Sequence, residues 1–222
     1  MSDFFLVFSE YGAQWGPRLA QAALITALLS FLGFLVAIIL GLLLALMQFS
    51  SVAALRKTAQ AHVIFFRGVP LLAVLFLIYF GLPGIGIVMS AFQAALVGLG
   101  LSFAAQMAEV FRSGLMAIPK GQWEAASAVG MTPLQSFRLI ILPQVIRVIR
   151  APIIVTFVSL LKDSSLASLI TVNELVLTGR AMATEYFLPL HIYIAVGAFY
   201  FIIAFPLSLL AKKMGRRSPV RT

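Results

Sequence analysis

The chain has 222 residues, of which 62% are hydrophobic and 10% are charged, and its formal net charge is +9. A soluble domain of this length needs far more polar surface, so the composition excludes a soluble fold and indicates a chain surrounded by lipid. The excess of Lys and Arg gathers at the ends of apolar runs, where it sets membrane topology, so we expect no nucleic-acid partner.

Five segments are long and apolar enough to cross a hydrocarbon core of about 30 Å, which takes about 20 helical residues. The second contains Arg67 and Pro70 and is expected to be a kinked span, with its freed backbone groups bonded to neighbouring helices. The sequence therefore predicts an all-α membrane protein, with residues 1–222 forming a single transmembrane domain. The five spans are expected at Leu19–Met47, Ala61–Phe80, Ile85–Glu109, Ile153–Ile170 and Leu190–Ala211.

Basic residues concentrate in alternate connections, and with five spans all of these lie on one side of the membrane. By the positive-inside rule that side is the cytoplasm, so the N-terminus is expected outside and the C-terminus inside. The opposite side carries Asp3, Glu10, Glu174, Arg180 and Glu185. The basic residues are Arg56 and Lys57, then Arg112, Lys120, Arg138, Arg147 and Arg150, and in the tail Lys212, Lys213, Arg216, Arg217 and Arg221.

The cytoplasmic connection at about 113–150 has its own helix stops and starts. Residues 122–129 are expected to form a short helix, and Gly130 can supply the left-handed conformation that ends it. Thr132, Pro133 and Gln135 form the pattern of a capping box that starts a second short helix, expected to end near Leu142 and Pro143. The resulting hairpin either docks on a partner or is an amphipathic cap of the bundle. Its available apolar side chains are Trp123, Val129, Met131, Leu134 and Phe137.

Two polar stripes follow the helical repeat on the third and fourth spans. The first consists of Ser102, Gln106, Glu109 and Ser113, and the second of Thr156, Ser159 and Asp163. A charged side chain at the centre of a membrane helix costs about 2.5 to 3.5 kcal/mol, so Glu109 and Asp163 are expected to face a cavity or a partner. The alternative is packing, because Glu109 can pair with Arg112 and Asp163 lies next to Lys162.

The remaining polar residues suggest no further chemistry. Arg67 is expected to anchor the helix break, with its side chain reaching towards the interface. His62 and His191 lack a second histidine at ligand spacing, so we expect no metal site and no catalytic residue. No Gly-x-x-x-x-Gly-Lys-Ser/Thr loop is present, so the chain has no P-loop for ATP.

Several ordered motifs resemble the membrane-spanning subunits of ATP-binding-cassette importers. Glu124-Ala125-Ala126, then Gly130, then Ile140-x-Leu142-Pro143 is similar to their EAA loop. The segments Arg67–Leu72, Tyr79–Pro83, Ala108–Arg112, Lys120–Ala126 and Lys162–Leu166 look like the branch that takes up histidine, glutamine, arginine and opine-type substrates.

This resemblance implies the fold, the coupling residues and the site. It implies a type I importer fold, with a coupling helix that docks on the ATPase through Gln122, Trp123, Glu124, Ala125, Ala126 and Gly130. It places the substrate pathway at Glu109 and Asp163, with Ser164, Gln106, Ser159, Thr156 and Ser102. In relatives the matching positions often hold tyrosine for Gln106, asparagine for Val155 and threonine for Ser164, so the particular amino acid stays open.

The resemblance also implies partners and a location. These are a second permease in a homodimer or heterodimer, two cytoplasmic ABC ATPase subunits that carry ATP and Mg, and a periplasmic amino-acid-binding protein. The chain itself is expected to bind no cofactor. The location is the bacterial inner membrane, crossed several times, and the function is import of polar amino acids by alternating access.

Two other functions remain to be distinguished by experiment. In a self-sufficient secondary transporter or channel, Glu109 and Asp163 would be proton or ion sites. In a purely structural assembly factor, both residues would tolerate alanine without loss of uptake.

Overall fold

The computed structural model describes residues 2–216, and over this range the chain is helical with no strand. Met1 and residues 217–222, which include the predicted tail cations Arg217 and Arg221, lie outside the described residues, as does the side chain of Asp3. In chain order the elements are α1 (Ser2–Gln48), α2 (Ala53–Gly68), α3 (Leu71–Phe76), the π-helical η1 (Leu77–Gly81), the 3-10 helix η2 (Leu82–Ile85), α4 (Ala91–Met116), α5 (Lys120–Ala128), α6 (Pro133–Gln135), the π-helical η3 (Ser136–Ile141), α7 (Leu142–Asp163), the 3-10 helix η4 (Ser164–Ile170), α8 (Leu175–Tyr186) and α9 (Pro189–Arg216).

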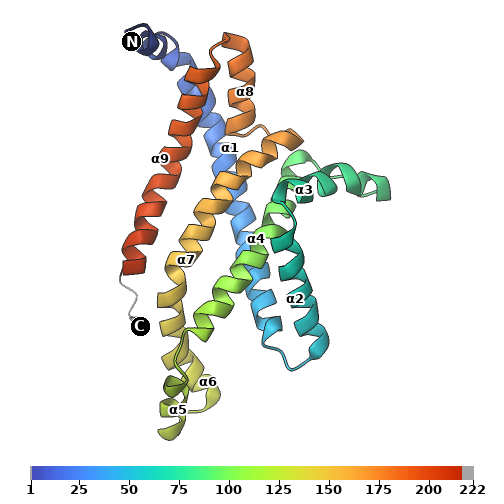
Figure 1. Ribbon diagram of the computed structural model, residues 1–222, viewed down its shortest axis with the longest axis vertical. Helices are drawn as coiled ribbons and strands as arrows, with labels where there is room; N and C mark the ends of the chain where they lie inside the picture. Colours follow the sequence, from blue (N-terminus) through green and yellow to red (C-terminus); the bar gives the residue numbers. More distant parts are fainter. Residues whose placement is uncertain (1, 217–222) are drawn as a thin grey trace.

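Four helices within the described range are long and apolar enough to cross a membrane, and a broken pair provides a fifth candidate span. The four cover Leu6–Gln48, Ala91–Met116, Pro133–Ile170 and Pro189–Arg216. In Figure 1 they form the body of the molecule, with α8 at one end and the α5–α6 hairpin at the other. This arrangement confirms the predicted all-α membrane class with up to five spans.

The fifth span is broken at Pro70. Its two parts, Ala53–Gly68 and Leu71–Ile85, meet at an angle of 105°, so that α3 runs away from the bundle instead of continuing α2 (Figure 1). Val69 takes an extended conformation and donates its backbone N–H to the Phe65 carbonyl, and Pro70, which has no N–H, precedes the first residue of α3. The predicted kink is confirmed, but the bend is far larger than that of a kinked span.

The second helix of the hairpin does not end at Leu142 and Pro143, contrary to the prediction. The helical backbone runs from Pro133 through η3 and α7 to Ile170. The wider π turns of η3 directly precede Pro143, and a π-bulge relieves the clash of a proline ring with the preceding turn. Gln144 also donates its side-chain amide to the Ile140 carbonyl at 2.8 Å. The hairpin is therefore continuous with a membrane helix.

The connection between Ile170 and Pro189 holds a helix that the sequence analysis missed. α8 begins after Glu174, whose carboxylate accepts the backbone N–H of Leu177 at 2.8 Å. It packs against α9 and α1, and Arg18 of α1 pairs with Glu185 at 2.9 Å. The sequence analysis did not predict α8, because its apolar face is short and its charged residues obscure the pattern. Leu175 and Met182 form this face.

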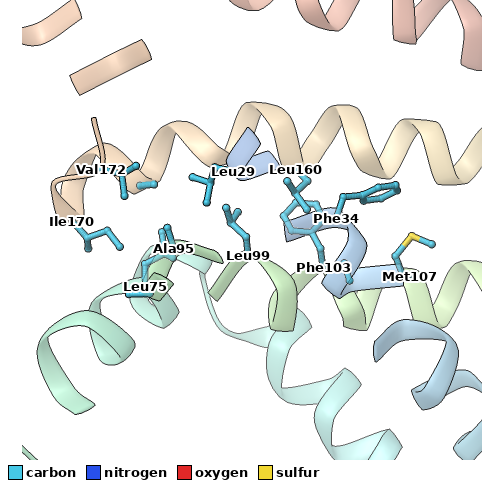
Figure 2. Close-up of a cluster of buried hydrophobic side chains, with 13 residues drawn as sticks. Leu29, Phe34, Leu75, Ala95, Leu99, Phe103, Met107, Leu160, Ile170 and Val172 are labelled. Atoms are coloured by element: carbon cyan, nitrogen blue, oxygen red, sulfur yellow. The ribbon is translucent and has the colours of Figure 1, made fainter. Parts of the chain in front are cut away.

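The main apolar core lies where α1, α3, α4 and α7 meet (Figure 2). Leu29 and Phe34 of α1, Leu99 of α4 and Leu160 of α7 are buried in it. The most extensive helix contact is between α1 and α4, where a Cβ on Gly41 would lie 2.5 Å from the Met107 Cβ. The core fixes α4 against α1 and α7, and thus the helices that carry the two predicted polar stripes.

Candidate functional site

A cavity of about 400 Å³ lies where the end of α2, the start of α3, α4 and the end of α7 come together. This volume is within the range of about 300 to 1,000 Å³ typical of small-molecule sites. Its polar lining consists of Arg67, Ser102, Gln106 and Asp163, and we call it the Asp163 cavity. Phe66 and Phe103 contribute apolar walls. The structure thus joins residues of both predicted stripes at one site.

The polar groups of the Asp163 cavity lack protein partners. Ser102 is 6% exposed, and its Oγ is buried without a hydrogen-bond partner in the described part of the chain. Arg67, Gln106 and Asp163 likewise make no side-chain hydrogen bond or ion pair with any residue in 2–216. Only Ser102 of these four residues is buried, whereas Arg67, Gln106 and Asp163 are exposed. The free-energy cost of a buried polar group without a partner therefore applies to Ser102, and a bound ligand with polar atoms would relieve it.

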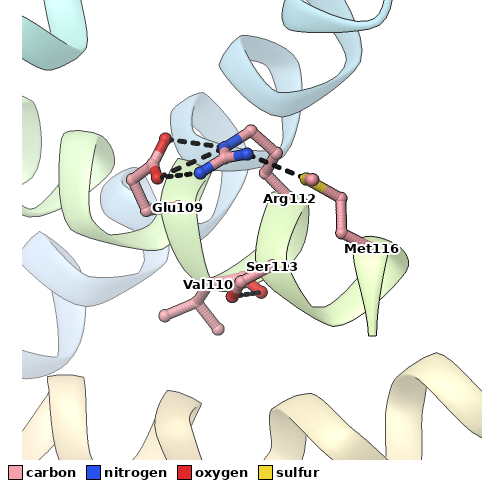
Figure 3. Close-up of polar contacts among 5 residues, drawn as sticks. All are labelled: Glu109, Val110, Arg112, Ser113 and Met116. Atoms are coloured by element: carbon pink, nitrogen blue, oxygen red, sulfur yellow. Dashed lines mark hydrogen bonds and ion pairs between the residues drawn. The ribbon is translucent and has the colours of Figure 1, made fainter. Parts of the chain in front are cut away.

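Glu109 lies in a different environment one turn further along α4. It accepts three hydrogen bonds from Arg112, at 2.7, 3.1 and 3.2 Å between nitrogen and oxygen. Figure 3 shows the guanidinium spread across the carboxylate, with its other edge donating to the Met116 sulfur at 2.9 Å. Ser113, the last residue of the first stripe, donates to the Val110 carbonyl at 3.1 Å (Figure 3). Glu109 is therefore already paired.

A second cavity, of about 520 Å³, adjoins this ion pair, and we call it the Glu109 cavity. It is lined by Gln48, Gln60, Arg67, Glu109 and Arg112, among other residues. Arg67 lines both cavities and forms their common wall, and its positive charge also acts on Glu109.

Three other predicted pathway residues lie outside both cavities. Thr156 is buried within the bundle at 7% exposure. Ser159 lines a third cavity, between α7 and α9, together with Lys162 and Lys212. Ser164 is fully buried and donates its hydroxyl to the Leu161 carbonyl at 2.8 Å. It also accepts a hydrogen bond from the Ser30 hydroxyl of α1 at 3.2 Å. Ser164 thus serves helix packing in this structure.

A buried polar network continues from Ser164 towards the end of the molecule that carries α8. Thr26 accepts the backbone N–H of Leu175, and Glu174 accepts the Tyr200 hydroxyl at 2.8 Å. Burial raises the pKa of Glu174, and hydrogen bonds from the backbone and from Tyr200 oppose that rise. This network ties α1, α8 and α9 together. It includes Glu174, which the sequence analysis had used only to orient the chain.

The hairpin at the opposite end has every turn element that the sequence predicts. Gly130 is left-handed, with φ of 81°, and its N–H bonds the Ser127 carbonyl while Met131 N–H bonds the Ala126 carbonyl. These two bonds are those of a Schellman motif. Thr132 and Gln135 form the capping box, at 2.9 and 3.3 Å. The fixed turn holds α5 and α6 at a defined angle.

The predicted coupling residues divide between the inside and the outside of this hairpin. Trp123 packs against the apolar cluster of Ile118, Ile141 and Val145, and Ala126 is 5% exposed. Gln122 accepts a hydrogen bond from Gln144 at 3.2 Å and so links α5 to α7.

The outward surface is formed by the other members of the set. Glu124, Ala125 and Gly130 are exposed. Beside them Val129 is 75% and Leu134 is 64% exposed, so apolar side chains are exposed at the tip of the hairpin.

The described residues of these sites form no metal-binding group. In residues 2–216 no three His, Cys, Asp or Glu side chains come together in a group that could hold a metal ion. The chemistry of the Asp163 cavity is that of ion pairing and hydrogen bonding, supplied by one guanidinium, one carboxylate, one amide and one hydroxyl.

The sequence analysis left Arg67 out of the site because it read the residue as an anchor of the helix break. Its signal was present, since a cation directly before a Gly-x-Pro break lies in a discontinuous membrane helix. Transporters place substrate sites at such breaks.

Comparisons with known proteins agree on one family. Residues 37–218 match the family described as binding-protein-dependent transport system inner membrane component. The probable amino-acid permease protein YxeN of Bacillus subtilis (strain 168) is 40% identical over 211 residues, 93% of this chain and 94% of that protein. The probable amino-acid ABC transporter permease protein YckA of the same organism is 42% identical over 178 residues, 80% and 79% of the two chains.

A solved structure shares the fold along nearly the whole chain. It is described as the crystal structure of an amino acid ABC transporter with histidines, and it is 31% identical with a TM-score of 0.85. The match covers 96% of this chain and 98% of that one.

Proposed function

Because this chain belongs to the family of binding-protein-dependent transport system inner membrane components and is therefore a permease subunit of an ABC importer, we propose that its cargo is a polar amino acid or a compound derived from one, such as an opine. The chain is a transport subunit and not an enzyme. ATP and Mg belong, in this proposal, to a separate ATPase.

The observation that carries the proposal is the hairpin at the end of the bundle (Figure 1). It is rigid, because its turn is closed by paired backbone groups and its first helix is linked to α7. It also presents Glu124, Val129 and Leu134 outward. A rigid projection with exposed apolar side chains is suited to dock in a cleft of an ATPase subunit.

The hairpin is connected directly to two membrane helices, so a movement of the hairpin can be transmitted to them. α5 follows α4 after a turn at Pro119, and the helix that starts at Pro133 continues without interruption to Ile170. Movement of the hairpin by the ATPase would therefore move α4 and α7 as rigid bodies, and both line the Asp163 cavity. Such motion opens the cavity to one side of the membrane and then to the other, which is alternating access.

The Asp163 cavity supplies the contacts for an amino acid. Asp163 is the carboxylate placed to receive an ammonium group, since no cation within 2–216 forms an ion pair with it. Ser102 and Gln106 offer hydrogen bonds to the polar atoms of the side chain. Glu109, bonded to Arg112, lines the adjoining Glu109 cavity.

The proposed assembly contains a second permease, identical or similar, two cytoplasmic ABC ATPases and an external amino-acid-binding protein. The hairpin end with its basic residues faces the cytoplasm, and the end with α8 faces the periplasm, where the binding protein delivers its ligand. The N-terminus is then periplasmic and the C-terminus cytoplasmic.

The proposal is tested by transport in proteoliposomes that contain the permease, its ATPase and its binding protein. We expect uptake of at least one of arginine, glutamine, histidine or cystine. This uptake should require ATP on the side of the membrane where the ATPase is bound. Uptake by the permease alone, driven by an ion gradient, would instead support a secondary transporter.

A further inference from the structure

We propose that Arg67 binds the α-carboxylate of the substrate, so that the Asp163 cavity recognises the zwitterionic end of an amino acid. This inference rests on the proposed function and assigns a role to a side chain that the sequence analysis treated as a helix anchor.

The first argument is the charge of the cavity. Among the residues that line it, Arg67 carries one positive charge, Asp163 carries one negative charge, and the others are neutral. The lining is therefore neutral overall but has two separate poles, as has an amino acid with its ammonium and carboxylate groups. Asp163 can pair only with the ammonium group, and Arg67 is the cation in the lining that can pair with the carboxylate, although both side chains are exposed in the single chain.

The second argument is that Arg67 has no partner of its own. The nearest candidate is Glu109, but that carboxylate already accepts three hydrogen bonds from Arg112. Elsewhere in residues 2–216 no carboxylate lies within ion-pair distance of Arg67. The guanidinium, which binds carboxylates with two parallel hydrogen bonds, is thus open to a ligand.

The third argument is the position of Arg67 in the last turn of α2, directly before the break at Val69 and Pro70. The break ends α2 at the cavity and brings the backbone of the following segment to the same wall, since Val69 and Leu71 also line it. Substrate sites of transporters are formed at such interruptions of membrane helices.

A fourth observation separates this site from an accidental gap between helices. Ser102, which lines the cavity from α4, is 6% exposed and has an Oγ without a partner in the described range. Two unpartnered polar groups on different helices, one charged and one neutral, therefore line the same cavity. Since Arg67 also borders the Glu109 cavity, a bound carboxylate would hold it on the Asp163 side.

The test measures binding to the whole permease and ATPase complex in lipid nanodiscs, without the binding protein, so that the permease alone selects the ligand. The probes are tritiated arginine, glutamine, histidine and cystine, each compared with its α-carboxamide, which keeps the ammonium group and lacks the negative charge. We expect the wild-type complex to prefer at least one of the free acids to its carboxamide. In Arg67→Gln the affinity for that acid should fall about ten- to hundredfold, the range for a hydrogen bond to a charged group, while carboxamide affinity stays constant.

The controls separate recognition from folding. Lys57→Gln removes a cation from the exposed surface of the same helix, outside both cavities, and should leave the preference for the acid unchanged. Arg67→Lys keeps the positive charge but cannot donate the two parallel hydrogen bonds of a guanidinium. It should give a preference for the acid over the carboxamide that is intermediate between wild type and Arg67→Gln.

Two results would overturn the inference. One is an Arg67→Gln complex that keeps the wild-type preference for the acid, and the other is an equal loss of acid and carboxamide binding, which would mark Arg67 as structural. If the wild-type complex binds none of the four acids, the role assigned to Arg67 fails, whereas the proposed function is judged separately by ATP-dependent uptake in the proteoliposomes that also contain the binding protein.

Discussion

The hairpin and the Asp163 cavity use their polar groups in opposite ways. In the hairpin, the Schellman turn at Gly130 and the capping box at Thr132 pair the backbone groups of both helix ends. In the cavity, Arg67, Ser102 and Asp163 have no hydrogen-bond or ion-pair partner within the described residues. A part that transmits motion needs one fixed shape, whereas a part that binds a ligand must keep bonding capacity free.

The pair of Glu109 and Arg112 lies within the predicted pathway, but its polar groups are bonded to each other, as those of the hairpin are. Its carboxylate is saturated by the guanidinium at 2.7 Å. The two carboxylates that the sequence treats alike therefore differ in their bonding, and we expect variants of each region to fail in different ways.

The largest effect is expected from Gly130→Val in the hairpin. The left-handed φ of 81° costs about 1 to 3 kcal/mol for a residue with a Cβ, and it is a genuine outlier for a β-branched one. The turn should therefore change shape, and uptake and substrate-stimulated ATP hydrolysis should both fall more than about tenfold while ligand binding persists. Proteoliposome assays measure all three. Gly130→Asn, which tolerates this conformation, should retain coupling, and normal coupling in Gly130→Val would refute the role of the turn.

The next effect is expected from Asp163→Asn in the cavity. Loss of the charge removes the partner of the substrate ammonium group, so uptake should fall about ten- to hundredfold. Membrane insertion, complex assembly and basal ATP hydrolysis should be unchanged, in contrast to the hairpin variant. Uptake equal to that of the wild type would remove Asp163 from the pathway.

A smaller effect, on stability and not on recognition, is expected from Arg112→Gln. This change leaves Glu109 without its three hydrogen bonds and should destabilise the permease by about 1 kcal/mol, or a few degrees in thermal midpoint. The midpoint is measured in detergent, and uptake at low temperature is measured beside it. A loss of uptake as large as that of Asp163→Asn, without a lower midpoint, would show that the ion pair itself contacts substrate.

The smallest effect is expected from Ser102→Ala. A single neutral hydrogen bond contributes about 0.5 to 1.5 kcal/mol, so uptake should fall about two- to tenfold. Ser113→Ala is the matched control on the same stripe, because the Ser113 hydroxyl already bonds the Val110 carbonyl and lines neither cavity. Equal uptake by the two variants would contradict a ligand contact at Ser102.

Sequence reasoning predicted the features that depend on local rules. Long apolar runs gave the membrane helices, and Gly130, Thr132 and Gln135 gave the hairpin turn and its caps. Ser102 and Gln106 of the first predicted stripe and Asp163 of the second line one cavity, and their role in the substrate pathway stays a prediction.

The errors arose where tertiary structure overrides a local rule. The sequence predicts a helix stop at Pro143, but the helix continues past it after the π turns of η3, for which the sequence gives no signal. The 105° bend at Pro70 depends on packing against α4, and the pairing of Glu109 depends on the rotamer of Arg112. These features are set by contacts with residues distant in the sequence or by side-chain rotamers. Local sequence patterns specify neither of them.

The most direct test of the account is a disulfide or bifunctional crosslink from the hairpin to the ATPase. The chain has no cysteine, so a single cysteine can be placed at Val129, which is 75% exposed on the hairpin, or at Val88, which is 80% exposed and precedes the start of α4. The account predicts that Val129→Cys captures the ATPase subunit in the assembled complex and that Val88→Cys does not. Capture from Val88, or none from Val129, would contradict it.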